Sequence, residues 1–419
     1  MFRRILFIAA LVIAGEMVFG LPFHVSRFFR PTMLDVFGFS NTQLGDLFAV
    51  YGITAMVSYF PGGVLADHFS ARRLIAASLV ATGLGGFYMA SIPSAIQMAL
   101  LYGFWGVTTI FMLWGAMIRA TREWGGDSSQ GAAFGILESG RGLTAAIVAS
   151  IAAIAFAILM PDDATLASDE ERLRAFRAVI FLYSAFALAA GLLAWLVIPE
   201  STAIPENRLN PFRGMLQVVG RPIIWAQALI IVCAYCCYKG SDNYSLYAVQ
   251  VLGMDEVDAA RLTAVGSYVR PIAALAAGLI ADRLSAKRSI GAAFGLLILA
   301  YVALSTLTPD MVGIPIIVAN IFVALFAVFA LRGIYFALLE ETSTPRHITG
   351  TAVGMISLVG YTPEVFFASV AGRILDATPG AGGHMNLFTL LAVIAAVGVA
   401  VVLWLIYLQR NKVEPVPVS

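Results

Sequence analysis

The chain has 419 residues, of which 60% are hydrophobic and 12% are charged, and its mean hydropathy is +0.87. A water-soluble domain carries roughly a quarter charged residues, so this composition excludes an ordinary soluble protein and indicates an integral membrane protein. The net charge of +1 supplies no basic field for nucleic acid. We therefore expect membrane lipid and a small molecule as partners, and no nucleic acid.

Twelve apolar stretches are long enough to cross the hydrocarbon layer. A crossing helix needs about 20 mostly apolar residues, because the backbone must satisfy its own hydrogen bonds. The stretches are 5–29, 43–66, 74–93, 96–120, 130–159, 177–198, 223–250, 258–281, 289–307, 313–340, 348–374 and 385–409. They predict an all-α integral membrane protein of 12 transmembrane helices. Residues 1–199 form an N-terminal six-helix bundle, 200–222 a cytoplasmic linker and 223–419 a C-terminal six-helix bundle.

The distribution of Lys and Arg predicts the orientation. With both termini inside, fifteen of the 26 Lys and Arg residues lie at the cytoplasmic face, and the large opposite loop at 161–176 is acid-rich. Cytoplasmic loops carry an excess of Lys and Arg, so we expect a multi-pass protein of the cytoplasmic (inner) membrane with cytoplasmic termini. The three cysteines, Cys233, Cys236 and Cys237, have no histidine at metal-ligand spacing, so we expect no metal and no cofactor.

Two segments of the first half of the chain recur in the second half. GGVLADHFSARR, which ends at Arg73, recurs as AGLIADRLSAKR, which ends 215 residues later at Arg288. GAAFGILESG, from Gly131, recurs 219 residues later as GTAVGMISLVG. The two offsets relate spans 2 and 5 to spans 8 and 11, so the halves are predicted to be parallel repeats of six spans.

The longer repeat predicts a conformational motif at the cytoplasmic end of two even-numbered helices. We expect Gly63 and Gly278 to permit close approach of a neighbouring helix. We expect Asp67 and Asp282 to accept hydrogen bonds from the N–H groups at a neighbouring helix start, where negative charge is favourable. The basic residues that follow, which we expect to anchor each loop to the inner face, are Arg72, Arg73, Lys287 and Arg288.

These two copies resemble the Gly-x-Leu-Ala-Asp-Arg-x-Gly-Arg-Arg signature of the major facilitator superfamily. Ser70 and Ser285 stand where the signature has its second glycine, and Ala71 and Ala286 where it has the next basic residue. The resemblance implies a monomeric secondary transporter whose two bundles rock about a site near the membrane midplane. The start of span 7, AYCCYKGSDNYSLY, is similar to a pattern of the organophosphate:phosphate antiporter branch, displaced by one residue.

Eight ionisable residues lie within the predicted spans. Each costs at least about 2.5–3.5 kcal/mol to insert, so a span that keeps one usually needs it. They are Glu16, Glu138, Arg141, Lys239, Asp242, Arg270, Arg332 and Glu364. Two pairs among them, 138 with 141 and 239 with 242, are spaced i, i+3 and are either structural ion pairs or parts of a site.

Arginines without a partner in their own helix predict the class of substrate. Arg270 and Arg332 have none, and guanidinium groups suit a carboxylate, sulfate or phosphate. We therefore expect an anionic or zwitterionic organic solute. The predicted substrate-binding residues are Arg270, Arg332, Lys239, Arg141, Tyr238 and Tyr361.

Glu16 is the first candidate for proton coupling, because no basic residue lies within a turn of it along its helix. A buried carboxylate without a counter-charge binds protons readily. In the alternative interpretation Glu16 hydrogen-bonds a neighbouring helix and does not titrate. The other candidates are Glu138, Asp242 and Glu364. His24, Arg27 and Arg30 lie near the outer end of the same span, where Arg30 is expected to extend toward the interface.

Other function classes fit the sequence less well. Drug/proton antiporters of the superfamily carry an Arg followed by Gly in helix 4 and a Gly-Pro run in helix 5, whereas these spans read ALLYGFWGVTTIFMLWG and GILESGRGL. No nucleophile–base set lies within the spans, so we do not expect an enzyme. The duplicated signature argues against a channel. A drug/proton efflux antiporter and a membrane solute sensor that does not transport both stay open.

Overall fold

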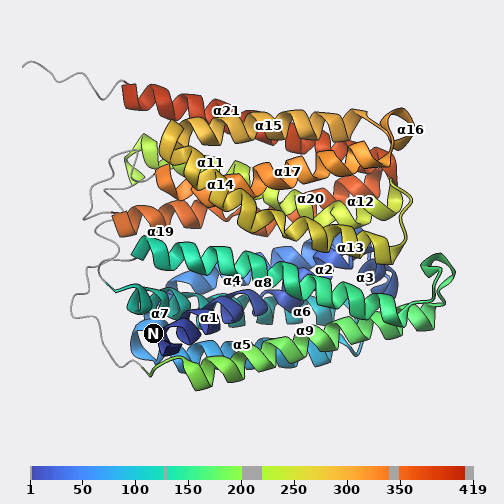
Figure 1. Cartoon of the computed structure of the whole chain (residues 1–419), viewed down its shortest axis with the longest axis horizontal. Coiled ribbons are helices and arrows are strands. Elements are labelled where there is room, and N and C mark those ends of the chain that lie inside the picture. Colours follow the sequence, from blue (N-terminus) through green and yellow to red (C-terminus); the bar gives the residue numbers. More distant parts are fainter. Residues whose placement is uncertain (1, 127–129, 201–218, 339–348, 411–419) are drawn as a thin grey trace, which may run out of the picture. The chain divides into compact units, whose positions relative to one another are not determined.

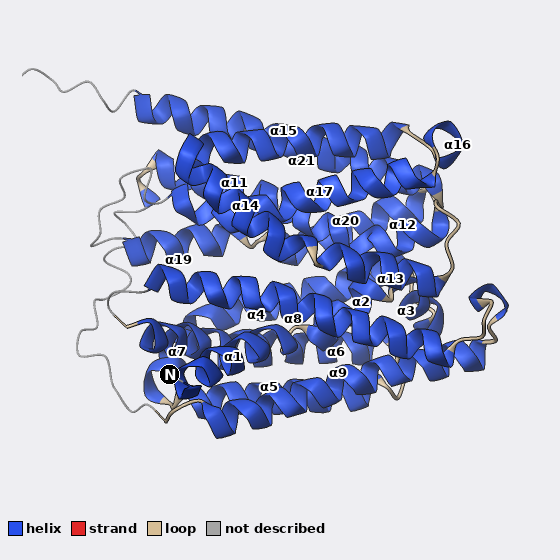
Figure 2. Cartoon of the chain, viewed as in Figure 1, coloured by secondary structure: helices blue, strands red, loops and turns tan. Residues whose placement is uncertain are grey.

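The computed structural model describes residues 2–126, 130–200, 219–338 and 349–410. Within these ranges the chain consists of helices joined by short loops, and no strand occurs in them (Figure 2). Every one of the twelve predicted spans coincides with a helix or with a run of consecutive helical segments in the described part of the chain.

The described part of the first half forms six helical runs, coloured from blue to green in Figure 1. Their segments are α1 (Phe2–Met17), η1 (Gly20–His24), α2 (Val25–Phe28), α3 (Arg30–Phe37), α4 (Asn41–His68), α5 (Ala71–Met89), α6 (Ala95–Gly106), η2 (Val107–Trp114), α7 (Gly115–Gly125), α8 (Gln130–Leu159), η3 (Ala164–Leu166) and α9 (Asp169–Val197). The segments η1 and η2 are π-helical, a geometry that is frequent at functional sites.

The described residues of the second half form six more runs. Their segments are α11 (Pro222–Gly240), η4 (Ser241–Asn243), α12 (Tyr244–Gln250), α13 (Glu256–Ser267), α14 (Val269–Leu284), α15 (Ala286–Thr306), α16 (Pro309–Val312), α17 (Ile314–Ile334), η5 (Tyr335–Ala337), α19 (Thr349–Gly360), α20 (Pro363–Ala377) and α21 (Ala381–Arg410).

Length and hydropathy support the predicted number of spans. Among the described residues, nine helices are long and apolar enough to cross a membrane. Two further runs qualify as bent pairs: α1 with η1 and α2, at 41°, and the two parts of α4, Asn41–Tyr59 and Pro61–His68, at 53°. The 19-residue α5 occupies the remaining predicted span, so the fold has the twelve helices that the sequence predicted.

Local sequence signals fix several helix starts. Ser40 and Gln43 form a capping box at the start of α4, with Ser40 Oγ accepting from the Gln43 backbone at 3.1 Å. The same arrangement of Ser with Gln or Glu three residues later starts α6 and α9. Because a capping box satisfies two otherwise unpaired backbone donors, it makes each helix begin at a defined residue.

The chain divides into two compact units. Unit 1 comprises Met1–Glu206, Asp242–Pro271 and Glu364–Ala381, and unit 2 comprises Asn207–Ser241, Ile272–Pro363 and Gly382–Ser419. Parts of three spans of the second half therefore pack with the first half. The predicted bundle boundaries stay a prediction, and most of the predicted linker lies outside the described residues.

Candidate functional site

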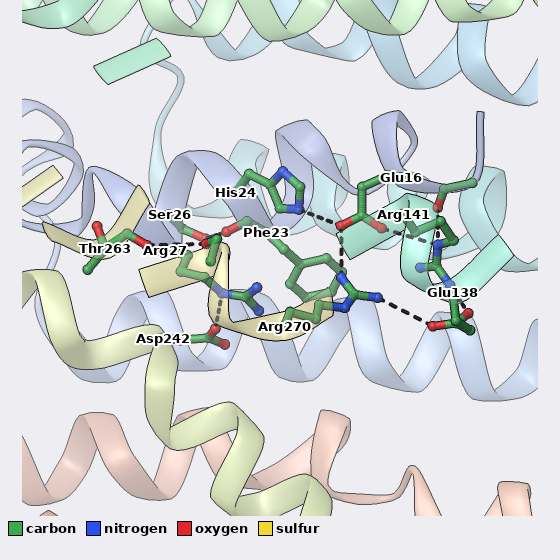
Figure 3. A network of polar contacts seen from close by, with 12 residues as sticks. Glu16, Phe23, His24, Ser26, Arg27, Glu138, Arg141, Asp242, Thr263 and Arg270 are labelled. Carbon is green, nitrogen blue, oxygen red and sulfur yellow. Dashed lines mark hydrogen bonds and ion pairs between the residues drawn. The ribbon is translucent and has the colours of Figure 1, made fainter. Parts of the chain in front are cut away.

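Glu16 is the centre of a buried polar network in unit 1. Its side chain is 3% exposed near the end of α1 and faces three cationic or hydrogen-donating groups from other segments. Arg141 Nε of α8 lies 3.1 Å from Glu16 Oε2, while His24 Nε2 of η1 and Arg270 Nη1 of α14 lie 3.2 and 3.3 Å from Glu16 Oε1 (Figure 3). Glu16 is therefore not the carboxylate without a counter-charge that we expected.

Arg141 is held rigidly in this network. Its Nη1 lies 2.5 Å from Glu138 Oε1, which confirms the predicted i, i+3 pair, and its Nε also donates to the Gly15 carbonyl at 3.1 Å. Gly15 makes room for these contacts, since a Cβ there would lie 2.6 Å from Met117 Sδ and 3.2 Å from Arg141 Cδ. Phe19 and Trp114, at 5.6 and 5.8 Å from the guanidinium carbon, add cation–π contacts.

Arg270 is held more loosely. Its Nη1 and Nη2 are shared between Glu16, at 3.3 Å, and Glu138, at 3.4 Å, whereas charge-assisted hydrogen bonds are ordinarily about 2.7–2.9 Å. The stem of Arg270 lies against Gly142, where a Cβ would be 3.0 Å from its Cγ and Cδ. The Glu138 side chain is 51% exposed, so the network is accessible from this edge, whereas Glu16 at the other edge is buried.

The network has no net charge when its two carboxylates and two guanidinium groups are ionised and His24 is neutral. Buried charges persist where they compensate one another, which explains how this membrane-embedded cluster is tolerated. Glu16, Arg141 and Arg270 stand far apart in the sequence, so a search along single helices could not pair them. The structure therefore pairs Glu16 and Arg270, because their partners come from other helical segments.

A second ion pair joins the two halves of the chain within unit 1. Arg27 Nε lies 2.6 Å from Asp242 Oδ1, and Ser245 donates to the Arg27 carbonyl at 2.8 Å. Arg27 thus contacts Asp242 from another span, and the predicted i, i+3 pair of Asp242 with Lys239 stays a prediction. Lys239 itself is 2% exposed in α11 of unit 2.

The remaining predicted binding residues gather in unit 2. The guanidinium carbon of Arg332 lies 3.9 Å from the ring centroid of Tyr238 and 5.8 Å from that of Tyr235. Tyr361 packs edge-on against Tyr235 at 5.1 Å, and its hydroxyl is 3.1 Å from that of Tyr335. These half-buried tyrosines surround a cation with polar hydroxyls, an arrangement suited to recognising an anion that carries a ring.

The cytoplasmic motif is only partly described. Arg72 and Arg73 lie 2.7 and 2.5 Å from the carboxylate of Glu200, just after α9, and Lys287 donates to Gln409 at 2.9 Å. No hydrogen bond or ion pair of Asp67 occurs among the described residues, and the side chain of Asp282 lies outside them. The predicted helix caps of both aspartates stay predictions.

The expected close approach at the motif glycines is absent from the described part of the structure. Apart from the adjoining backbone of the same helix, no described atom lies within 4 Å of a Cβ built on Gly63 or Gly278. Gly62 makes the close contact instead, since a Cβ there would lie 2.9 Å from Phe111 Cα. The helical phase explains the difference, because neighbouring residues of α4 point about 100° apart.

Close approach of backbones occurs at the opposite end of α4, against α20. A Cβ at Gly45 would lie 2.3 Å from the Ala368 carbonyl oxygen, one at Gly52 would lie 2.6 Å from that of Glu364, and one at Gly372 would lie 2.3 Å from that of Asn41. We call these three glycines the α4–α20 glycines. Glu364, a predicted coupling residue, is 8% exposed at this contact.

A carboxylate of α20 caps the start of α4 beside these glycines. Asp376 accepts from the backbone N–H groups of Asn41 and Thr42, at 3.1 and 2.7 Å, and from Asn41 Nδ2 at 3.1 Å. Asn41 in turn accepts from Arg30, which is 3% exposed and so does not extend to the interface as expected. The sequence pattern gave no signal for this cap, because Asp376 and Asn41 are joined only by the fold.

A metal centre has no support among the described residues, which contain no group of three or more His, Cys, Asp and Glu side chains arranged to hold an ion. The three cysteines are buried free thiols. Arginine, histidine and carboxylate side chains are the groups that the described network brings together, and these are groups that can bind charge and exchange protons.

Comparison with known proteins identifies similar chains. Residues 5–368 match the family model described as Major Facilitator Superfamily. Inner membrane protein YqcE of Escherichia coli (strain K12) is 28% identical, over 98% of this chain and 96% of its own. The Probable nitrate/nitrite antiporter NarK1 of Thermus thermophilus is 25% identical over 63% of this chain and 58% of its own. A bacterial homologue of the human lysosomal transporter Spinster, in an inward-facing and unoccupied conformation, superposes with a TM-score of 0.75 at 15% identity, covering 100% of this chain and 98% of the other.

Proposed function

Since this chain belongs to the major facilitator superfamily and is a membrane transporter of that family, we propose that it moves a small organic anion or zwitterion by proton-coupled alternating access. The proposed substrate-binding residues are Arg270, Arg332, Lys239, Arg141, Tyr238 and Tyr361. Glu16, Glu138, Asp242 and Glu364 are the proposed coupling residues. The proposed setting is the cytoplasmic membrane, with both termini inside and the protein acting as a monomer.

The observation that carries the proposal is the position of Arg270. Its two terminal nitrogens each contact a different carboxylate at more than 3.2 Å, and the side chain of one of those carboxylates is half-exposed. An incoming carboxylate, sulfate or phosphate offers the same guanidinium two oxygens in one plane, a bidentate geometry that is stronger than two long contacts. The anion would thus compete with Glu16 and Glu138 for Arg270.

Transport requires that this competition be linked to conformation. Arg270 belongs to the second repeat, and Glu16 and Glu138 belong to the first, so any rearrangement that separates α14 from α1 and α8 breaks their contacts. A ligand shifts a conformational equilibrium only by binding the two states differently. Competition for Arg270 supplies such a difference, because the anion is favoured where the glutamates release the arginine.

A similar protein supports an anionic substrate. NarK1 is named as a probable antiporter of nitrate and nitrite, both of them small oxyanions. Drug/proton efflux is the second candidate, because the half-buried tyrosine rings beside Arg332 also offer aromatic faces to a ring-bearing drug. A sensor without transport would bind the ligand and show no flux.

A thermal-shift screen of the purified protein in detergent tests the class of substrate. A ligand that binds the folded state stabilises it by RT ln(1 + [L]/Kd), so the shift grows with the free ligand concentration relative to Kd. We expect stabilisation by members of a panel of carboxylates and organophosphates, and none by quaternary ammonium compounds. Stabilisation by the cations alone refutes an anionic substrate.

A pair of matched variants tests the site. Arg270→Gln is expected to weaken binding of the stabilising anion more than tenfold, about 1.4 kcal/mol. Arg261→Gln, which removes an exposed arginine paired with Asp258 in the same span, is expected to bind like the wild type. Equal affinities in the two variants would remove Arg270 from the site. Counterflow in proteoliposomes then separates a transporter of that anion from a sensor.

A further inference from the structure

His24 is a buried histidine with one ring nitrogen that the network leaves unused. It is 2% exposed at the end of η1, and its ring lies edge-on to Phe28 and Tyr183, at 5.6 and 5.9 Å. Its Nε2 contacts Glu16 Oε1 at 3.2 Å, whereas its Nδ1 has no hydrogen-bond partner among the described residues (Figure 3). A buried polar atom without a partner calls for an explanation, because nearly all such atoms are satisfied.

The contact with Glu16 fixes which nitrogen carries hydrogen. An ionised carboxylate only accepts hydrogen bonds, so Nε2 is the protonated nitrogen and donates to Glu16. In the neutral ring Nδ1 then keeps its lone pair. Nδ1 is therefore the atom at which His24 can accept a proton without breaking its bond to Glu16.

Glu16 Oε1 is shared between His24 and a cation from the second repeat. Arg270 Nη1 lies 3.3 Å from the same oxygen that His24 contacts. The other charged or titratable groups that face His24 are Arg27, which is paired with Asp242, and Tyr183 of α9, while Arg141 lies on the far oxygen of Glu16. With Arg270 in place, a charged imidazole would be a surplus cation beside Arg27 and Arg270.

Departure of Arg270 reverses that balance. The buried network would then hold Glu16 and Glu138 against Arg141 alone, which leaves one uncompensated negative charge. One proton restores neutrality. Histidine is the side chain whose charge changes most readily near neutral pH, and His24 already donates to the carboxylate that needs the charge.

We propose that His24 is the proton carrier of the transport cycle, taking up one proton at Nδ1 when Arg270 leaves Glu16 and releasing it when Arg270 returns. The proton comes from water on the side to which the network opens, and the imidazolium replaces the guanidinium as the counter-charge of Glu16. Glu16 stays ionised throughout. This inference rests on the proposed proton-coupled cycle, and it assigns the transported proton to the imidazole of His24 rather than to the carboxylate of Glu16.

Nitrogen-15 NMR of the histidines in the full-length protein, held in lipid nanodiscs, tests this assignment without any substrate. The chain has only four histidines, and His24→Gln identifies the signal of His24. In Arg270→Gln the departure of the cation is permanent, so His24 is expected to protonate at a proton concentration at least tenfold lower than in the wild type. Arg270→Lys, which keeps the charge, is expected to restore most of the wild-type titration.

Two controls keep the outcome decisive. His384 is also fully buried but lies in α21 of unit 2, and its signal is expected to stay unchanged in the arginine variants. If Arg270→Gln does not fold, Arg270→Met retains an apolar stem against Gly142 and serves in its place. An unchanged His24 titration in the folded variant overturns the proposal, as does an infrared band of a protonated carboxylic acid that disappears in Glu16→Gln. Either result leaves the anion-binding test of Arg270 unaffected.

Discussion

The α4–α20 glycines provide the sharpest test of how this transporter changes conformation. Gly45→Ala adds a methyl group that would lie 2.3 Å from the Ala368 carbonyl oxygen and 2.8 Å from Ser369 Cα. Both atoms belong to the backbone, so no side chain can rotate away. Carbon atoms in contact ordinarily stand about 3.5–4.0 Å apart, and the two helices must therefore separate by about 1 Å or more.

The magnitude follows from the cost of overpacking. Forcing an extra methyl group into a packed contact costs typically about 1–3 kcal/mol. The penalty falls on the conformation in which α4 and α20 touch, and a conformation in which they are apart does not incur it. Because 1.4 kcal/mol is a factor of about ten, the equilibrium is expected to shift away from the closed contact by a factor of about 5 to 150.

Electron–electron distance measurements report this shift directly. Nitroxide labels at the exposed positions Asp35 and Ala377, with the three native cysteines replaced, report on α3 and α20 at this end of the helices. The fraction of short distances is expected to fall in Gly45→Ala. Gly295→Ala is the matched control, because no described atom lies within 4 Å of its Cβ position in α15. A wild-type distance distribution and wild-type thermal stability in Gly45→Ala would refute the reasoning.

Three further predictions concern charged residues. Asp376→Asn is expected to weaken the cap on α4 by about 1 kcal/mol, so the same labels should show about a fivefold shift toward conformations in which α4 and α20 are apart. An unchanged distance distribution would show that the cap does not hold α4 against α20. Asp67→Asn and Asp282→Asn are expected to reduce counterflow, while both variant proteins still insert into the membrane normally. The loss is expected to be larger for Asp67, by analogy with the family. Full transport activity in both variants would contradict a conformational role of the cytoplasmic motif. Glu16→Gln removes the acceptor shared by His24 and Arg270, so proteoliposomes are expected to exchange the anion without concentrating it in a proton gradient. Accumulation at the wild-type level would exclude Glu16 from coupling.

The spans and the repeat were predictable because they depend on local chemistry. Inside the membrane, a stretch of about 20 apolar residues satisfies its own backbone hydrogen bonds by forming a helix, whichever residues surround it. The duplication is visible because Asp67 and Asp282 lie in matching segments. The helices that carry buried charges were also identifiable, since an ionised group inside an apolar span stands out against its surroundings.

The ion-pair partners of the buried charged residues were not predictable from their spacing along a helix alone. The i, i+3 rule found Glu138 with Arg141, because one helix carries both. It gave no sign of the contact between Asp242 and Arg27 of another span, or of the partners of Glu16, which come from three segments. The π-helical turn at Gly20–His24 also changes the facing of side chains in span 1, so regular helical spacing does not describe how His24 comes to face Glu16.

The loose and the tight contacts of this network have different consequences for a transport cycle. Arg141 is bound by Glu138 at 2.5 Å within one helix and by Glu16 of the same repeat, so these contacts can persist while the repeats move. Arg270 crosses between the repeats and makes only contacts longer than 3.2 Å. A carrier must release its contacts in every cycle, and strong ones would trap it in a single state. The long contacts of Arg270 in this conformation thus suit the proposed exchange of Arg270 between the two glutamates and a substrate, while the contact of Arg141 can hold Glu16 in position.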